Sequence, residues 1–166
     1  MHPPRAQVGF TLVETLVAIS VLLVSLAGPL TIATKGLSTS LFARDQVVAF
    51  YLAGEAVEYV RNIRDTNILN NRPWLTGLDA CFGSGTCAVD VKNSRVDDCA
   101  GACAPLRYDP LTDFYSYSAG DASPFRRTVS MTTVNADEVS INVTVSWKTG
   151  ALTKQFSIQE HILNWQ

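Results

Sequence analysis

Charged residues are scarce in this sequence of 166 residues. Lysine, arginine, aspartate and glutamate together make up 17% of it, against roughly 25% in average soluble domains. Thirteen basic and fifteen acidic residues give a net charge of −2, which argues against a nucleic-acid-binding domain with a basic surface. Hydrophobic residues make up 47%, so the chain is too apolar to be disordered. Its length suits one domain with an appendage.

Catalytic arrangements are missing as well. The sequence contains no G-x-S-x-G element, no phosphate-binding glycine loop and no cysteine beside an obvious base. His161 is the one histidine outside the first nine residues, which excludes a zinc site of the His-His-Glu type beyond them. We therefore predict that the protein is not an enzyme and needs no cofactor.

The hydrophobicity is concentrated near the amino terminus. From Ala6 to Thr34 there are 29 residues and one charge, Glu14, so the other 27 of the 28 charges fall in the remaining 137 residues. The central part, residues 10–30, would form a helix about 31 Å long, which matches a hydrocarbon layer of roughly 30 Å. The segment before it carries Arg5 and no acid, which favours a cytoplasmic amino terminus.

Two simple interpretations of this segment are a cleaved secretory signal, with Ser25-Leu26-Ala27 as its cleavage site, and a plain transmembrane anchor. Neither interpretation requires Glu14. A carboxylate inside a membrane span costs a few kcal/mol. An ionisable group in such a place is a functional candidate, and its partner should be sought.

The run Gly9-Phe10-Thr11-Leu12-Val13-Glu14 stands at the head of the apolar segment, behind a short polar leader. It resembles the processing site of type IV pilins and of the pseudopilins of type II secretion. The resemblance implies a leader peptide at residues 1–9, cleavage by a prepilin peptidase between Gly9 and Phe10, and N-methylation of Phe10. It also implies a single-pass protein of the inner membrane with an extracytoplasmic domain, which an assembly platform incorporates into a pilus or a related filament at the cell surface.

Cleavage would create a new amine at Phe10, the missing positive partner of Glu14. Residues four apart share one face of a helix, so this amine can approach Glu14 within a subunit. In a filament, the resemblance implies that Glu14 meets the terminal amine of a neighbouring subunit. This contact would set the axial register, because a buried acid without a partner is costly. Gly28 and Pro29 predict a bend or local unwinding on packing, or alternatively a simple kink at the membrane exit.

The rest of the chain divides into three parts. The apolar helix of residues 10–34 is predicted to continue as an amphipathic helix over residues 35–65, because apolar residues recur there at helical spacing. Residues 66–124 hold five glycines, four prolines and all four cysteines, which predicts an irregular, loop-rich segment. Residues 125–166 are predicted to form an antiparallel sheet.

Three strands are expected in that last part. Residues 125–134 are weakly patterned, whereas residues 139–147 alternate cleanly between apolar and polar side chains, which is typical of a half-buried strand. Residues 152–162 return as a third strand, with Phe156 and Ile158 pointing inward. The predicted fold is α+β and pilin-like: a long N-terminal helical spine packed on a small antiparallel sheet, with a disulfide-bearing loop region.

The four cysteines, Cys81, Cys87, Cys99 and Cys103, lie in the loop-rich segment, which the expected topology places outside the cytoplasm. Disulfides persist in such a compartment. Four cysteines allow three pairings, and local, nested and crossed pairings all remain open. A zinc site is less favoured because the first spacer has five residues. The acids of this segment make a calcium site conceivable, but no D-x-D-x-D-G spacing occurs, and we predict no metal.

We therefore expect a structural subunit that polymerises with other pilin or pseudopilin subunits through its N-terminal helix. Major pilin, minor pilin and type II pseudopilin remain open, with a slight preference for the last two. The alternative is a membrane-anchored extracytoplasmic binding domain that does not polymerise. No nucleic-acid partner is predicted.

Overall fold

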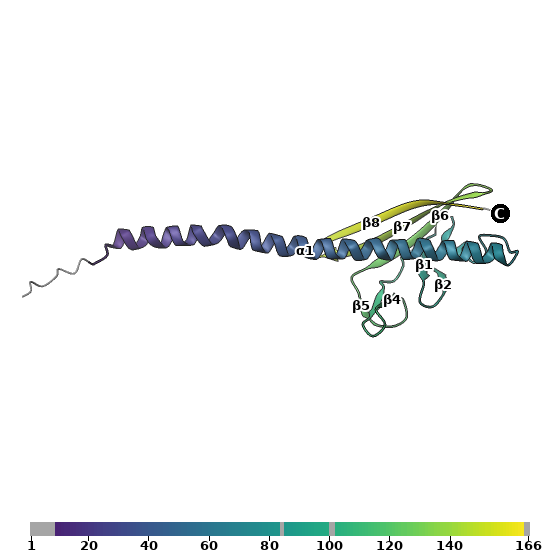
Figure 1. Cartoon of the computed structure of the whole chain (residues 1–166), viewed down its shortest axis with the longest axis horizontal. Coiled ribbons are helices and arrows are strands. Elements are labelled where there is room, and N and C mark those ends of the chain that lie inside the picture. The colour runs from purple at the N-terminus through teal and green to yellow at the C-terminus, as the bar shows by residue number, and fades with distance from the viewer. Residues whose placement is uncertain (1–8, 84, 100–101, 165–166) are drawn as a thin grey trace, which may run out of the picture. The chain divides into compact units, whose positions relative to one another are not determined.

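The computed structural model describes residues 9–83, 85–99 and 102–164, and the chain divides into two units, Met1–Ala43 and Arg44–Gln166. We call residues 9–43 the stem and residues 44–166 the head. One α-helix, α1 (Leu12–Leu69), contributes residues to both units (Figure 1). Residues 1–8 of the predicted leader peptide lie outside the described residues.

The helix α1 ends four residues later than the predicted boundary at Asp65. Its end is a Schellman motif, in which Asn71 has a φ of 53°. Two backbone N–H groups after the helix donate hydrogen bonds to carbonyls of its last turn. The N–H of Arg72 donates to Asn67 at 2.9 Å, and that of Asn71 donates to Ile68 at 3.0 Å. Left-handed backbone at an asparagine therefore sets the boundary, which the apolar period could not show.

The main sheet of the head has five antiparallel strands in the order β2-β1-β6-β7-β8. Three of them are the predicted carboxy-terminal strands: β6 (Arg126–Asn135), β7 (Glu138–Thr149) and β8 (Leu152–Leu163). The alternation predicted for β7 is confirmed, since all five of its inward residues are buried: Val139, Ile141, Val143, Val145 and Trp147. Phe156 and Ile158 of β8 are half-buried, because β8 is an edge strand.

The loop-rich segment contains more regular structure than predicted. It supplies β1 (Cys87–Asp90) and β2 (Arg95–Asp98) to the main sheet, after a short 3-10 helix, η1 (Asp79–Cys81). It also forms a separate three-stranded sheet in the order β4-β3-β5, made of β3 (Arg107–Asp109), β4 (Phe114–Ser116) and β5 (Asp121–Ala122). The main sheet is therefore not confined to residues 125–166. Strands of two to four residues are too short to produce a readable period.

One face of α1 is buried within the head, and half of its buried hydrophobic residues are alanines. The buried hydrophobic residues of that face are Ala49, Leu52, Ala53, Ala56, Val57 and Val60. Helix and sheet meet directly where the rings of Phe50 and Phe156 lie 5.8 Å apart. The predicted α+β fold, with a long helix, an antiparallel sheet and a disulfide-bearing loop region, is thus confirmed.

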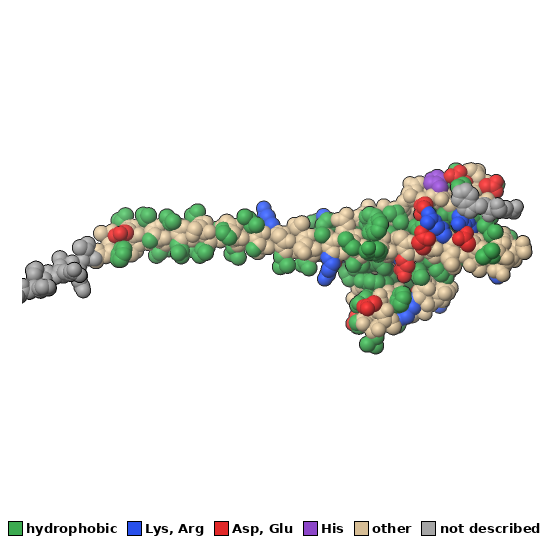
Figure 2. Space-filling view, viewed as in Figure 1, with side chains coloured by type: hydrophobic (Ala, Val, Ile, Leu, Met, Phe, Trp, Pro, Cys, Tyr) green, Lys and Arg blue, Asp and Glu red, His purple; other side chains and the backbone are tan. Residues whose placement is uncertain are grey.

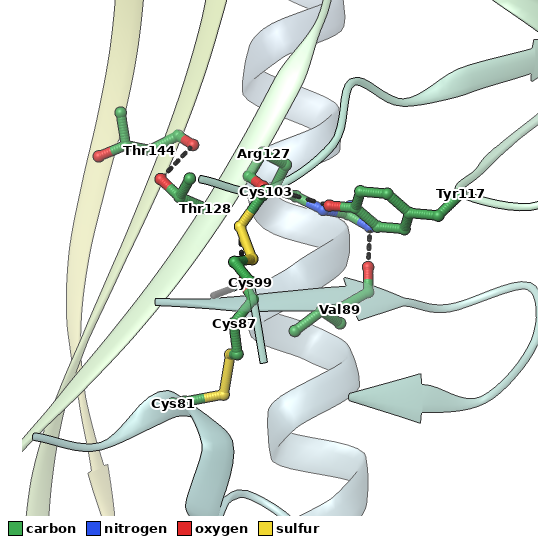
Figure 3. The surroundings of a disulfide bond; sticks show 9 residues. All are labelled: Cys81, Cys87, Val89, Cys99, Cys103, Tyr117, Arg127, Thr128 and Thr144. Atoms are coloured by element: carbon green, nitrogen blue, oxygen red, sulfur yellow. Dashed lines mark hydrogen bonds between the residues drawn. A yellow bond between two sulfur atoms is a disulfide. The ribbon is translucent and has the colours of Figure 1, made fainter. Parts of the chain in front are cut away.

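A fully buried arginine joins three elements of the head. Arg127 of β6 donates from Nη1 to the carbonyl of Leu52 at 2.8 Å and to the carboxylate of Glu55 at 2.6 Å. Its Nη2 donates to the carbonyl of Val89 in β1, as Figure 3 shows. Its own carbonyl accepts a hydrogen bond from the hydroxyl of Tyr117 at 3.2 Å. This arginine fixes α1, β1 and β6 to one another with directional contacts.

Both disulfides of the head are local. Cys81 pairs with Cys87, and Cys99 pairs with Cys103 (Figure 3). The first bond joins η1 to the first residue of β1, and both of its cysteines are fully buried. It therefore fixes the start of a strand that has only four residues of its own.

Replacing Cys81 and Cys87 together by serine is expected to lower the free energy of unfolding by about 2 kcal/mol, because a short closed loop no longer restricts the unfolded chain. Chemical denaturation of the full-length protein would measure this change. Intact masses before and after reduction provide the check on the bonds, since two bridges add four hydrogens. Equal masses would contradict the assignment.

The turn between β3 and β4 is organised by one carboxylate. Asp109 accepts hydrogen bonds from the ammonium of Lys92 at 2.9 Å, the hydroxyl of Thr112 at 2.8 Å and the backbone N–H of Leu111 at 3.0 Å. These donors, with Lys92 the largest contribution, lower the pKa of Asp109 from 3.8 to about 2. The group therefore stays ionised in the folded head at pH values where the unfolded chain takes up a proton.

A pH dependence follows from this lowered pKa. The contribution of Asp109 to stability is fully present above pH 3.8 and is lost as the pH falls through about 2. Asp109→Asn should therefore lower stability at pH 6 and remove part of the slope of stability between pH 4 and pH 2. Urea denaturation across that range measures both effects. Parallel pH profiles for the two proteins would contradict the assignment.

Candidate functional site

The predicted cleavage site lies outside regular structure. Gly9 and Phe10 are both exposed and precede α1, and the Phe10 side chain is 82% exposed. A peptidase that binds an extended backbone therefore needs no helix to unwind at this bond. The absence of a Cβ at Gly9 lets the chain fit closely into such a site.

Thr11 caps the start of α1. Its hydroxyl accepts a hydrogen bond from the backbone N–H of Glu14 at 3.3 Å, so Thr11 is the N-cap and Glu14 is the third helical residue. The spacing Thr-x-x-Glu is the sequence signature of a capping box. An acid at this position also faces the positive end of the helix dipole. The hydrogen bond from Glu14 uses its backbone N–H, and its side chain lies in the first turn of the helix.

The helix begins at Leu12, so Phe10 is not helical in the uncleaved chain. The argument that Phe10 and Glu14 share a helix face therefore does not apply to this state. The capping by Thr11 is a feature that sequence reasoning missed, although the Thr-x-x-Glu spacing was available to reveal it.

The stem presents apolar side chains on all sides. Figure 2 shows hydrophobic groups along both visible edges of this part of α1. Fifteen large hydrophobic residues of the stem are exposed: Phe10, Leu12, Val13, Leu16, Val17, Ile19, Val21, Leu22, Leu23, Val24, Leu26, Leu30, Ile32, Leu37 and Leu41. Such a surface is unstable in water and requires lipid or other apolar helices around it.

Most hydroxyl groups of the stem donate hydrogen bonds within the helix. The hydroxyls of six serine and threonine residues donate to backbone carbonyls three or four residues earlier: Thr15, Ser20, Ser25, Thr31, Thr34 and Thr39. Each bond removes a polar group that would otherwise face hydrocarbon. Glu14 is the only charged side chain between Leu12 and Thr34.

The structure is helical through Gly28 and Pro29, with Pro29 inside α1. Proline supplies no N–H, so one carbonyl of the preceding turn lacks its usual donor. The helix remains continuous here in the single chain. Bending or unwinding at this pair on packing in a filament stays a prediction.

Comparison with known protein families finds a match in the amino-terminal segment. Residues 4–28 match the prokaryotic N-terminal methylation motif. The chain carries the signature of type IV pilins and pseudopilins. No curated protein and no solved structure matches it. The matched residues include Gly9, Phe10, Glu14 and Gly28 of the predicted site and end one residue before Pro29.

One helix of this pilin-like chain, among the residues described, is long and apolar enough to cross a membrane by length and composition. Together with the motif, it indicates a membrane-anchored, single-pass protein. The motif also implies processing by a prepilin peptidase and assembly with other pilin subunits. Within the described ranges, no group of three or more metal-ligating side chains comes together.

Proposed function

We propose that this protein is a structural subunit of a type IV pilus or a related filament. A prepilin peptidase cleaves it after Gly9 and methylates the amine of Phe10. The mature chain is held in the inner membrane with its head outside the cytoplasm, and it polymerises through α1. The observation that carries the proposal is the methylation motif at the head of a stem whose apolar side chains are exposed on all sides.

Glu14 is the register-setting residue in this proposal. In lipid, its carboxylate lies near the head-group region, at the start of the helix. In the filament, it is surrounded by the stems of other copies, and the N-terminal amine of a neighbour supplies the compensating charge. Any other axial position leaves the acid unpaired among apolar side chains, at a cost of several kcal/mol.

The competing proposal is an anchored head that does not polymerise, and the amino terminus of the cellular protein distinguishes the two. Mass spectrometry is expected to find a peptide that begins with N-methylated Phe10. Gly9→Val should leave the leader attached, because a branched side chain at the cleaved bond obstructs the peptidase. Gly28→Val is the matched control and should be processed normally. An intact Met1 or a start at Gly28 in the unaltered protein would contradict the proposal.

A type II pseudopilin remains the second candidate within the same class. It shares the stem and the processing step, so only the filament that incorporates the protein distinguishes it. Purification of pili and of secretion filaments from the same cells, followed by immunoblotting for this chain, would assign it to one of them.

A further inference from the structure

The strand β8 forms an open edge of the main sheet. It pairs with β7 over its whole length, from Leu152 to Leu163, without a bulge. In the part of the chain that the structure describes, no strand pairs with its other side. It contains neither proline nor glycine. A long, continuous edge of this kind is a template for another strand.

The hairpin turn determines which backbone groups of β8 point outward. Gly150 has a φ of 61° at the first position of the two-residue loop between Thr149 and Leu152, as in a type II′ turn. In this turn the N–H of Leu152 faces Thr149 of β7. Because the pattern alternates, the N–H and carbonyl groups of the odd-numbered residues face outward. These residues are Thr153, Gln155, Ser157, Gln159 and His161.

The open edge ends at Leu163. Its carbonyl accepts a hydrogen bond from Nη1 of Arg64 in α1 at 3.2 Å. The available edge therefore runs from Thr153 to His161. It is centred on Ser157, which is exposed.

The sequence of this edge is complementary to itself. When two β8 strands are placed antiparallel about Ser157, Lys154 lies opposite Glu160 of the second copy. In the same register, Phe156 lies opposite Ile158. All four side chains lie on one face of the sheet. Lys154, Phe156, Ile158 and Glu160 pair with the inward-facing residues Trp147, Val145, Val143 and Ile141 of β7, respectively. Opposite charges and apolar pairs directly across two strands both stabilise a sheet.

No neighbouring register gives the same match. A slip of two residues in one direction places Lys154 opposite Ile158, and a slip in the other direction places it opposite Ile162. Both slips leave Glu160 without a basic partner across the strands. Arg61 of α1 forms an ion pair with Glu160 in the same chain, which holds this carboxylate on the helix-facing side, where the second copy would meet it. The charged and apolar pairs across the strands therefore favour this register.

Exposed apolar side chains flank the edge on that same side. Phe50 of α1 is 56% exposed, although its ring lies 5.8 Å from that of Phe156. Val47, one turn earlier on the helix, is 54% exposed, and Leu152 is 63% exposed. Figure 2 shows hydrophobic groups gathered over this part of the head. A second β8 strand, with its own Phe156 and Ile158 on this side, would remove part of this surface from water.

We propose that β8 is a homotypic docking edge, through which two heads join their five-stranded sheets into one continuous antiparallel sheet. The direction of the strand limits where this contact forms. β8 runs in the same direction as α1 in the head, since Phe156 meets Phe50, Glu160 meets Arg61 and Leu163 meets Arg64. A two-fold axis through Ser157 therefore sets the two copies of helix 44–69 antiparallel. This step rests on the proposed function: copies related by the symmetry of one filament all point their heads the same way, so the contact joins copies on two different filaments.

The test uses the full-length protein in detergent, with its mass measured by sedimentation or light scattering after subtraction of the detergent. The unaltered protein is expected to form dimers as its concentration rises. Ser157→Lys places two ammonium groups directly opposite each other in the dimer and should weaken dimerisation roughly tenfold. Thr132→Lys adds the same charge to the exposed end of β6 and is the matched control, expected to dimerise normally.

A cross-link tests the two-fold axis itself. All four native cysteines are paired, so Ser157→Cys introduces one free thiol, and mild oxidation should yield covalent dimers. Thr132→Cys should yield few. A protein that stays monomeric, or a dimer that Ser157→Lys leaves intact, would overturn the proposal. Glu14→Ala separates this contact from polymerisation, because it should affect filaments and leave the β8 dimer unchanged.

Discussion

Replacing Glu14 by alanine is expected to lower incorporation of the protein into filaments by at least about tenfold, while membrane insertion and cleavage after Gly9 persist. The stem becomes more apolar, so its insertion in lipid is not impaired. The substitution removes the carboxylate that selects one axial position of the stem among many similar apolar ones. That carboxylate makes the paired position more favourable than the others by a few kcal/mol. The ratio of sheared filaments to membrane-bound protein, measured by immunoblotting, provides the readout.

Two further variants isolate the charge of Glu14 from its position at the helix start. Glu14→Gln keeps the size of the side chain and removes the negative charge, so it should assemble as poorly as the alanine variant. Thr15→Ala is the matched neighbour: its hydroxyl donates only to the carbonyl of Leu12 in the same helix, and its incorporation should be normal. Normal assembly of Glu14→Gln would show that the acid acts only as a helix-start residue.

Arg127→Ala is expected to lower the free energy of unfolding of the head by about 3 kcal/mol, the largest loss of stability that we predict for a single substitution. The change leaves the buried carbonyl of Val89 and the partly buried carboxylate of Glu55 without their partner. It also opens a cavity beside Leu52. We place the value at the lower end of the range for broken buried ion pairs, because the Glu55 side chain is 28% exposed.

Chemical denaturation of the full-length protein in detergent, followed by tryptophan fluorescence, would measure this loss. Arg126→Ala provides the matched control one residue earlier on β6, where the side chain is half-buried on the other face of the strand. It should change stability by less than about 0.5 kcal/mol. Equal effects of the two substitutions would mean that burial of Arg127 is not what fixes α1 to the sheet.

The parts of the fold that repeat over many residues were predictable from the sequence. The alternation in β7 extends over nine residues, 139–147, and the apolar run of the stem over 21, 10–30, so both patterns are unambiguous. The strands β1 to β5 were missed, since two to four residues cannot establish a period. The end of α1 depended on left-handed backbone at Asn71. Asparagine adopts this conformation more readily than most residues, but its presence in a sequence does not predict it.

Among the functionally and structurally important residues, too, some were predictable from the sequence and others were not. Gly9, Phe10 and Glu14 form a contiguous motif, and the sequence places them without any knowledge of the fold. Arg127 could not be found in this way. Arginines are rarely buried, and the groups that stabilise this one lie 72 and 75 residues earlier, at Glu55 and Leu52. Contacts at that separation exist only after the chain has folded.

The internal hydrogen bonds of the stem hydroxyls affect how reversible assembly can be. Ser20, Ser25 and Thr31 each bond to a carbonyl of their own helix, so they require no donor or acceptor from the surroundings. A subunit that leaves the bilayer for the proposed filament therefore exchanges one apolar environment for another without breaking these bonds. Only Glu14 changes its polar partner in the transfer. The transfer therefore costs none of the hydrogen bonds of these hydroxyl groups in either direction.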